Sequence, residues 1–517
     1  MTKQSFLKGA FILIIAGLIT RLLGFINRIV VARIMGAEGV GLYMMAVPTL
    51  LLIITLTQLG LPVAISKLVA EADADNDREK VKRILVVSLS VTGVLSIVFT
   101  AIMILGAPII SQTLLTDARA FYPLIAISPI VPIVALSSVL RGYFQGLQNM
   151  KPTAYSQVIE QVVRITLVAA FTTAFLPLGL EYAAAGAMIS VVFGELASLI
   201  FMITMFKRNK KIRIRRQFFT YVKGGKRTFH DLMGIALPTT GSRLIGSFSF
   251  FLEPIVVAQS LALAGVATAM ATSQYGELSG YVIPMLLLPT FITYSLSVSL
   301  VPAISEAAYQ KNYSMIHHRL SQALRLALVS GGAAVVVLFV FAEPIMDLVY
   351  DAPTTAAYIK IMAPFSLFLY FQSPLQATLQ ALGLAKAAMI NSFIGAFVKI
   401  AAIFILASRP EFGIMGAALA IVIGFLLVTF LHFATVVKAI SFSLRIREVL
   451  KVVIAMVVSG GLAMWLLEHF LLQHSLIIKT GVSITVVFLV YMLFITLFGL
   501  IKKEEASRIP ILKNLVK

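Results

Sequence analysis

The sequence contains no cysteine and few charged residues, and both shortages narrow the class of protein. Without cysteine, disulfide bonds and thiolate metal sites are excluded. Only 12% of the 517 residues are charged and 59% are hydrophobic, whereas a soluble domain has about 25% charged and about 45–50% apolar residues. This composition excludes a soluble enzyme and indicates an integral membrane protein.

Two ligand-binding motifs are also missing. The chain has no Gly-x4-Gly-Lys-Ser/Thr loop for nucleotide phosphates. Residues 73–77 have the acidic spacing of a calcium loop, but Arg78 occupies the required glycine position and Ile84 the closing glutamate position. We therefore expect no metal and no cofactor, and a driving force supplied by the membrane potential or an ion gradient.

Long apolar runs dominate what is present. A membrane-spanning helix needs about 20 apolar residues to cross a hydrocarbon core of about 30 Å. The sequence predicts an all-α integral membrane protein with about fourteen transmembrane helices. The stretches lie near residues 9–34, 41–66, 84–106, 120–140, 154–176, 182–206, 229–258, 277–302, 321–342, 355–383, 387–407, 413–437, 449–467 and 476–500.

Basic residues are distributed unevenly between these predicted spans. With the N-terminus inside, most of the 42 lysines and arginines lie in cytoplasmic segments, and the outer loops hold only Arg119, Arg409 and Lys479. Because positively charged loops stay on the cytoplasmic side, we predict a multi-pass protein of the cell membrane with both termini in the cytoplasm. The same bias explains most of the formal charge of +20, so nucleic acid is not an expected partner.

The two halves of the chain resemble each other. Thr20–Gly24 in the first predicted span matches Ser242–Gly246 in the seventh, and Ala64–Ser66 matches Ala303–Ser305. Further matches, in the same order along both halves, are Pro129 with Pro364, Gln145 with Gln380, Lys151 with Lys386, Arg164 with Lys399, and Gly194 with Gly424. The first six spans are thus repeated as spans seven to twelve.

The repeat predicts how the chain is organised. Each copy has an even number of spans, so both copies enter the membrane from the same side and form two parallel six-helix lobes. Transporters typically have such lobes, with the substrate site between them near the membrane midplane. The predicted domains are an N-lobe (1–206), a basic cytoplasmic linker (207–228), a C-lobe (229–440), and two extra C-terminal helices with a cytoplasmic tail (441–517).

Several charged side chains lie inside predicted spans, where each charge costs about 2.5–3.5 kcal/mol even on the lenient insertion scale, and Arg21, Arg28 and Arg243 are the first candidates among them. The repeat places Arg21 and Arg243 at similar depths in opposite lobes. Arg28 follows Arg21 by roughly two turns, on nearly the same helix face. We predict that these three arginines face a water-filled cavity that binds the substrate.

Arg164 and Lys399 form a second repeated cationic pair, and Lys360 joins this set by its depth alone. Glu160 precedes Arg164 by four residues, the favourable order for an ion pair on a helix. Either a structural bridge or a substrate-binding role therefore fits Arg164. No acid lies at the corresponding distance from Lys399, because position 395 is Gly395.

Glutamates inside the spans offer an alternative to a substrate-facing cavity. Glu195, Glu253 or Glu277 could pair structurally with the three arginines, and together with Glu160 they are candidates for ion coupling. These acids are not mirrored between the lobes. A cavity rich in arginine should favour an anion such as a lipid pyrophosphate, because guanidinium binds phosphate in bidentate geometry.

Prolines within the predicted spans interrupt backbone hydrogen bonds and can bend helices that must move. Ordinary membrane helices also contain prolines, so both interpretations stay open. These residues are Pro129, Pro132, Pro284, Pro289, Pro364 and Pro374.

Several motifs resemble the stage V sporulation protein B group. That group belongs to the multidrug, oligosaccharidyl-lipid and polysaccharide (MOP) exporter superfamily, which includes the lipid II flippases. The resemblance covers essentially the whole chain and is most specific in the first half. Its motifs are Phe6–Gly9, Thr20–Phe25, Gly39–Met44, Gly60–Lys67, Arg141–Gly146 and Glu160–Ile165.

The resemblance implies two lobes around a central cavity that opens alternately to each side of the membrane. It implies a lipid flippase whose cargo is an undecaprenyl-pyrophosphate-linked peptidoglycan precursor of the lipid II type, used for the spore cortex. Expected partners are this cell-wall precursor, membrane lipids and cell-wall synthesis proteins. By motif, the cavity arginines of the flippases correspond to Arg21, Arg28 and Arg243, and the two extra helices help to form a groove for the lipid tail.

Other functions compete with this interpretation. Cavity arginines would recognise a shared pyrophosphate and not the sugar, so a teichoic or capsular lipid-linked oligosaccharide is the alternative cargo. A cation-coupled multidrug exporter would need an acid-dominated pocket. A membrane enzyme would need a catalytic cluster at one membrane face, whereas the outer loops offer only scattered acids, so we do not expect an enzyme.

Overall fold

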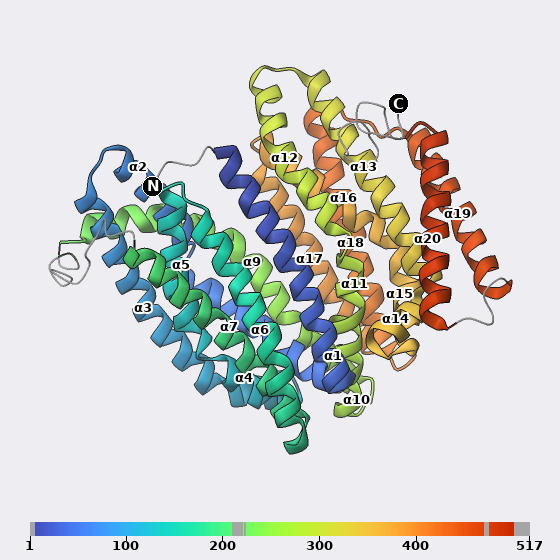
Figure 1. The fold of residues 1–517 in the computed structure, drawn as a ribbon, viewed down its shortest axis with the longest axis horizontal. Coiled ribbons are helices and arrows are strands. Elements are labelled where there is room, and N and C mark those ends of the chain that lie inside the picture. Colours follow the sequence, from blue (N-terminus) through green and yellow to red (C-terminus); the bar gives the residue numbers. More distant parts are fainter. Residues whose placement is uncertain (1–5, 209–220, 222–223, 470–474, 501–517) are drawn as a thin grey trace. The chain divides into compact units, whose positions relative to one another are not determined.

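The structure, a computed structural model, describes residues 6–208, 221, 224–469 and 475–500. Within these residues every regular element is helical (Figure 1). Thirteen segments of the described chain are long and apolar enough to cross a membrane. The predicted all-α, multi-pass membrane fold is therefore confirmed.

The first helix, α1 (Phe6–Gln58), contains the first predicted span and most of the second. It continues into α2 as a single apolar segment, Ile15–Ala74, of 60 residues. A straight helix of that length would be roughly three times as long as the hydrocarbon core is thick. The helix breaks at Gly36, whose φ of 66° and ψ of −175° suit only glycine. The predicted stretches 9–34 and 41–66 therefore lie on the two sides of this break.

The described chain divides into two compact units, and helices α1 to α10 belong to the first, Met1–Tyr281 with Ala407–Ile414. Within it α6 and α7 lie side by side, and α1 packs against α6 (Figure 1). After α1 its elements are α2 (Leu61–Ala74), α3 (Arg78–Ile109), η1 (Ile110–Leu114), η2 (Ala118–Ala120), α4 (Phe121–Ile127), α5 (Ile130–Gly146), α6 (Lys151–Phe175), η3 (Leu176–Leu178), α7 (Leu180–Arg208), α9 (Lys226–Leu263) and α10 (Thr268–Gly276).

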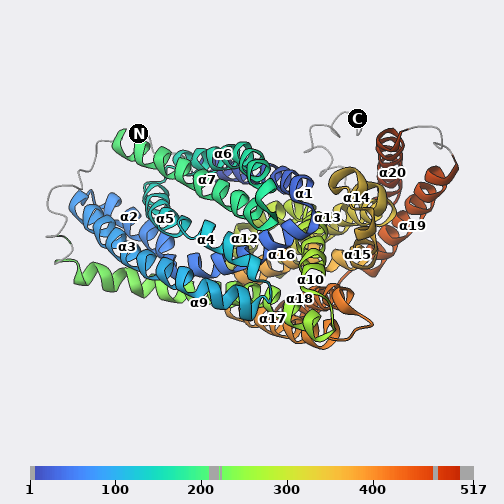
Figure 2. The same ribbon diagram turned by 90° about the horizontal axis from the view of Figure 1, so that it is seen from below.

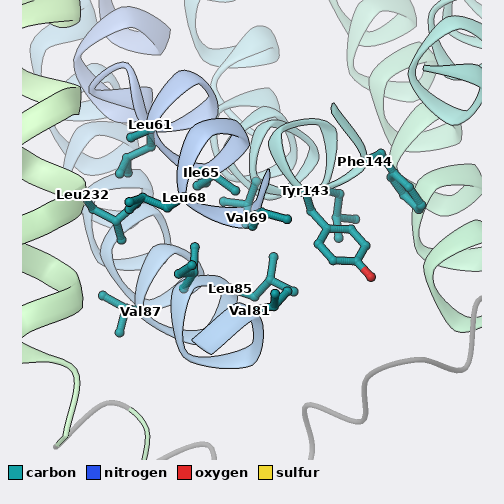
Figure 3. Close-up of a cluster of buried hydrophobic side chains, with 14 of the residues drawn as sticks. Leu61, Ile65, Leu68, Val69, Val81, Leu85, Val87, Tyr143, Phe144 and Leu232 are labelled. Atoms are coloured by element: carbon teal, nitrogen blue, oxygen red, sulfur yellow. The ribbon is translucent and has the colours of Figure 1, made fainter. Parts of the chain in front are cut away.

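An apolar core of the first unit lies between α2, α3, α5 and α9. Figure 3 shows Leu61, Ile65 and Val69 of α2 beside Leu85 of α3 and Leu232 of α9, and all five side chains are 0% exposed. The α2 residues recur four apart, so they share one face of the helix. This core fixes the short helix α2 and the beginning of α9.

The second unit comprises Val282–Leu406 and Met415–Lys517. Within it α19 and α20 lie side by side (Figure 2). The π-helix η4 (Glu277–Val282) crosses the boundary between the units. It is followed by α11 (Ile283–Leu287), α12 (Thr290–Tyr309), α13 (Tyr313–Val340), α14 (Ala342–Tyr350), η5 (Pro353–Thr355), α15 (Ala356–Met362), η6 (Ala363–Phe365), α16 (Ser366–Ala381), α17 (Ala385–Ala407), α18 (Gly413–Ile440), α19 (Ile446–His469) and α20 (Leu476–Leu497).

Three predicted spans are interrupted at prolines. Pro129 lies between α4 and α5, Pro289 between α11 and α12, and Pro364 within η6 between α15 and α16. Pro129 and Pro364 are counterparts in the repeat, so the same break occurs in both halves of the chain. Pro374, by contrast, lies inside α16, which continues through it.

The two extra helices pack against α13 at a glycine. Tyr491 of α20 donates a hydrogen bond of 2.8 Å to the carbonyl oxygen of Val329 on α13. A Cβ added at Gly332 would lie 2.6 Å from the same Tyr491 hydroxyl. The neighbouring Gly331 faces the ring of Tyr370 on α16. Helix α13 therefore joins α19 and α20 to the rest of the second unit.

The predicted basic linker, 207–228, lies largely outside the described residues, as does the predicted tail after residue 500. The predicted lobe boundaries come from the sequence repeat. The two units follow packing instead, and they group α9 and α10 with the first unit because these helices contact α1. The four predicted domains stay a prediction.

Candidate functional site

Four charged side chains of the first unit form a network between α5, α6 and α7. Arg164 donates from Nη2 to Oε1 of Glu160 at 2.6 Å, one turn away on α6. Arg141 of α5 donates from Nη2 to Oε1 of Glu195 on α7 at 2.8 Å. The same nitrogen lies 3.7 Å from Oε2 of Glu160. Arg141 thus connects both carboxylates, and we call these four residues the N-lobe network.

The N-lobe network balances two guanidinium groups with two carboxylates. Glu195 is only 4% exposed, and a buried charge is tolerated when it is paired and hydrogen-bonded. The predicted Glu160–Arg164 pair is present. Glu195, which the sequence offered as an alternative partner of the three cavity arginines, is paired instead with Arg141. Sequence reasoning singled out Arg141 only as part of a family motif.

The second repeated cationic pair has matching neighbours in the two halves. A Cβ added at Gly194 would lie 3.3 Å from Cβ of Arg164, and one at Gly424 would lie 3.2 Å from Cβ of Lys399. Gly194 and Gly424 are themselves counterparts in the repeat. In each half, the glycine therefore allows its helix to pack closely against the helix of the basic residue, beside the Cβ atom of that residue. The surroundings differ at the Glu160 position, because Gly395 occupies it in the second half.

The three predicted cavity arginines all have exposed side chains. Arg21 and Arg28 lie on α1 before Gly36, whereas Arg243 lies on α9. These two helices contact each other in the first unit. A guanidinium that faced hydrocarbon would be costly, so exposure inside a span indicates a polar environment around these side chains.

Arg28 borders a small cavity of about 10 Å³ in the first unit. Asn27 and Tyr43 supply further polar atoms to its lining, and Gly280 of η4 also lines it. The Oδ1 atom of Asn27 is buried and accepts no hydrogen bond within the described part of the chain. Arg28 is therefore next to an unused acceptor as well as open space.

Small residues bring α1 close to the segment that follows α9. Gly41 lies against the carbonyl oxygen of Thr272, and Gly276 lies against that of Ala37, closer than a Cβ would allow. Gly280 packs in the same way against a side-chain carbon of α1. The predicted span 277–302 is accordingly divided among η4, α11 and α12, and π-turns of this kind are frequent at functional sites.

A second charged cluster, which the sequence did not single out as a site, joins Glu38, Asp117, Arg119 and Thr272. Arg119 donates from Nη1 to Glu38 Oε1 at 2.7 Å and from Nη2 to Asp117 Oδ2 at 2.9 Å, and Thr272 donates to Asp117 Oδ2 at 2.7 Å. Burial alone would raise the pKa of Asp117, but the hydrogen bonds from Arg119 and Thr272 outweigh it and lower that pKa below its ordinary value. Ionised Asp117 thus ties the segment before α4 to α10.

Glu253, Glu277 and Lys360 lie on three different elements. Glu253 of α9 is 6% exposed and lies near Tyr275 of α10. Glu277 begins η4, and Lys360 is exposed on α15. Within the described ranges, no group of three or more histidine, cysteine, aspartate or glutamate residues could hold a metal ion. The predicted roles of these three residues in ion coupling and cargo binding stay predictions.

Comparison with known proteins places the sequence in a family. Residues 6–308, more than half of the chain, match the profile of the family described as polysaccharide biosynthesis protein, and residues 254–405 match that of MatE. Stage V sporulation protein B of Bacillus subtilis (strain 168) is 58% identical over 516 residues, covering 100% of both chains. Lipid II flippase MurJ of the same organism is 24% identical over 496 residues, or 91% of this chain and 90% of that one.

The fold is also similar to that of solved transporters. The structure of lipid II flippase MurJ in the inward closed conformation aligns with a TM-score of 0.72 at 16% identity, covering 94% of this chain and 98% of that chain. At this identity the likeness concerns the fold alone. Because the family profile and the full-length relative agree, the chain belongs to the polysaccharide biosynthesis protein family, together with stage V sporulation protein B, in the multidrug/oligosaccharidyl-lipid/polysaccharide exporter superfamily.

Proposed function

We propose that this protein is a flippase that moves an undecaprenyl-pyrophosphate-linked peptidoglycan precursor of the lipid II type across the cytoplasmic membrane, for synthesis of the spore cortex. The observation that carries the proposal is the exposure of Arg21, Arg28 and Arg243 inside membrane spans. The relatives add support, since one is a sporulation protein and another a lipid II flippase. In the proposed orientation both termini are cytoplasmic.

Recognition in this proposal depends on the pyrophosphate of the cargo. Guanidinium groups donate two parallel hydrogen bonds to phosphate oxygens and keep their charge at all relevant pH values. Arg21, Arg28 and Arg243 bind the pyrophosphate, Asn27 lies beside Arg28, and the polyprenyl tail stays in lipid while the two lobes alternate. Because no covalent bond changes, the protein acts as a transporter and not as an enzyme, and it needs no cofactor.

The N-lobe network is proposed to couple ions to this movement. Protonating Glu160 or Glu195 would leave Arg141 and Arg164 with an excess of positive charge, which would favour an anionic cargo. Glu253 and Glu277 are further candidates for this coupling. Lys399 and Lys360 are proposed as additional cargo-binding cations.

The alternative cargo is another lipid-linked oligosaccharide, of the teichoic or capsular type. The description of the matching family as polysaccharide biosynthesis protein supports it, and the arginines would bind the same pyrophosphate. A cation-coupled multidrug exporter is the remaining candidate, supported by the MatE match over residues 254–405.

Proteoliposomes test the proposal when labelled lipid II and a lipid-linked capsular sugar are compared side by side. We expect lipid II to be translocated, and Arg21→Gln or Arg243→Gln to lower its rate about tenfold or more, because each removes a charged hydrogen-bond donor. The matched control is Arg33→Gln, which changes an arginine of the same helix α1 near the end of a span. This variant should translocate lipid II at the wild-type rate.

Two results would contradict the proposal. Failure of the wild-type protein to accelerate either lipid would exclude a flippase for both cargos. Loss of the Arg21→Gln and Arg243→Gln proteins from the membrane, in place of a lower rate at normal abundance, would assign these arginines a structural role.

A further inference from the structure

Three segments on the predicted outer side meet at the charged cluster of Glu38, Asp117, Arg119 and Thr272. Glu38 lies between the first and second predicted spans, and Asp117 and Arg119 lie between the third and the fourth. Thr272 lies on α10, between the seventh and the eighth. By the sequence repeat, Thr272 belongs to the second half of the chain and the other three residues to the first. The cluster is therefore a contact between the two halves at their outer ends, within the first unit.

The ion pairs of this cluster lie within the first half. Arg119 is 2.7 Å from Oε1 of Glu38 and 2.9 Å from Oδ2 of Asp117. The backbone N–H of Arg119 also donates to Oδ1 of Asp117 at 3.0 Å. The side chain of Asp117 is only 3% exposed, and a buried carboxylate needs such a counterion. Separating the two halves would leave these bonds intact, so the buried charge would keep its counterion.

Two polar side chains of the second half complete the contact. Thr272 donates a hydrogen bond of 2.7 Å to Oδ2 of Asp117. Gln259 of α9 donates from Nε2 to the carbonyl oxygens of Thr113 and Leu114, at 2.7 and 3.1 Å. Both carbonyls belong to η1 at the end of α3, and the last carbonyl groups of a helix need partners from outside it. Water can replace each of these bonds when the segments separate.

Glycines shape the surfaces beside these bonds. Gly41 of α1 lies against the carbonyl oxygen of Thr272, and Gly276 of α10 lies against that of Ala37. Because neither glycine has a side chain, the backbones touch at these points without interlocking. Val40, next to Gly41, is only 2% exposed. The contact thus closes off the surface of α1 at this depth.

We propose that Thr272 and Gln259 form an outer latch, which holds the two halves together at their outer ends and opens when cargo leaves on that side. The ion pairs of the first half hold Asp117 in place as an acceptor. The latch itself consists of the hydrogen bonds from Thr272 and Gln259, so its opening breaks no ion pair of the cluster. The role in cargo release rests on the proposed transport function.

Labelling of a buried cysteine measures the opening of the latch without any cargo. Val40→Cys is the reporter, because this position is covered while the latch is closed. A membrane-impermeant maleimide on intact cells should label it about tenfold faster when Thr272→Val and Gln259→Leu are combined, and about threefold faster with either alone, since each removes hydrogen-bond donors between the halves. Thr268→Val changes an exposed residue one turn earlier on α10. It is the matched control and should leave the labelling rate unchanged.

Thermal denaturation of the same proteins in detergent separates opening from unfolding. We expect faster labelling at a melting temperature close to that of the Thr268→Val protein. If Thr272→Val, at a residue 1% exposed, does not fold, Gln259→Leu alone decides the test.

An unchanged labelling rate in the folded variants would overturn the proposal. So would a rise that the Thr268→Val control matches, or one that occurs only in protein that has lost its fold, because the contacts would then be purely structural. Labelling needs no cargo. A protein that opens as expected but translocates neither lipid would therefore contradict the proposed function and support the latch.

Discussion

Arg141 and Glu195 form an ion pair that connects α5 to α7 within the first unit. Their charged atoms are 2.8 Å apart, and the side chain of Glu195 is 5% exposed. In such surroundings the pair as a whole adds little net stability, because both charges lose water when they are buried. Removing one partner is different, since the remaining charge is then buried without its counterion.

We therefore predict that Glu195→Gln lowers the free energy of unfolding by about 3 kcal/mol. The measurement is thermal denaturation in detergent, followed by size-exclusion chromatography of the protein that remains folded. Glu181→Gln changes the other glutamate of α7, in its first turn, and should have little effect. The double variant Arg141→Gln with Glu195→Gln should lose less than the sum of its two single variants. A Glu195→Gln protein as stable as the Glu181→Gln control would show that the network contributes nothing to stability.

The same network separates what residue spacing can predict from what it cannot. Glu160 and Arg164 lie one turn apart on one helix, so their ion pair follows from helical geometry. Arg141 and Glu195 are 54 residues apart, and their contact depends on how two helices pack. Local spacing contains no information on that packing, so the pair of Arg141 with Glu195 could not be predicted from the sequence.

At the scale of elements, α13 is held on two sides by tyrosines at adjacent glycines. Tyr491 of α20 contacts Gly332, and Tyr370 of α16 contacts Gly331. Each hydroxyl donates to a backbone carbonyl, Tyr491 to Val329 and Tyr370 to Leu286. Buried tyrosines usually find such partners. The glycines therefore provide the room that allows α19 and α20 to attach.

We predict that Gly332→Ala weakens this attachment and lowers the free energy of unfolding by about 1–3 kcal/mol, as is usual for overpacking. The added Cβ would lie 2.6 Å from the Tyr491 hydroxyl. Thermal denaturation in detergent measures the loss, and Gly461→Ala on α19, where a Cβ meets nothing within 4 Å, is the control.

A second substitution identifies the atom responsible. Tyr491→Phe removes the clashing oxygen, so Gly332→Ala should cost less in a Tyr491→Phe protein than in the wild type. Some cost should remain, because Val452 and Met456 still lie 3.0 and 3.2 Å from the added carbon. If Gly332→Ala is as harmless as Gly461→Ala, α19 and α20 do not depend on this contact.

The breaks within helices were predictable only in part. Prolines marked the interruptions at Pro129, Pro289 and Pro364, since proline removes a backbone hydrogen bond. Pro374 nevertheless lies inside the continuous helix α16, and Pro132 lies in the first turn of α5, where proline is tolerated, so proline alone does not determine where a helix ends. The π-turn at η4 has no sequence signal of this kind, and it appears where Gly280 packs against α1.

At the scale of the whole molecule, composition and repetition were sufficient for the fold class. Apolar runs long enough to cross a bilayer leave helices as the structure that satisfies the backbone of each span. The repeat then accounts for the paired breaks at Pro129 and Pro364 and for the paired glycines at Arg164 and Lys399. It could not show which unit α9 and α10 pack against, because that depends on contacts made only after folding.

The orientation of the molecule can be tested directly by labelling single introduced cysteines. The natural chain contains no cysteine, so the unmodified protein is the background control for labelling. We predict that a membrane-impermeant maleimide labels Glu411→Cys, in the turn between α17 and α18, on intact cells. Asp75→Cys, in the turn between α2 and α3, should be labelled only after the membrane is permeabilised. Both residues are exposed, so access to the reagent and not burial decides the result. The opposite labelling pattern would show that both termini lie outside and would contradict the predicted orientation.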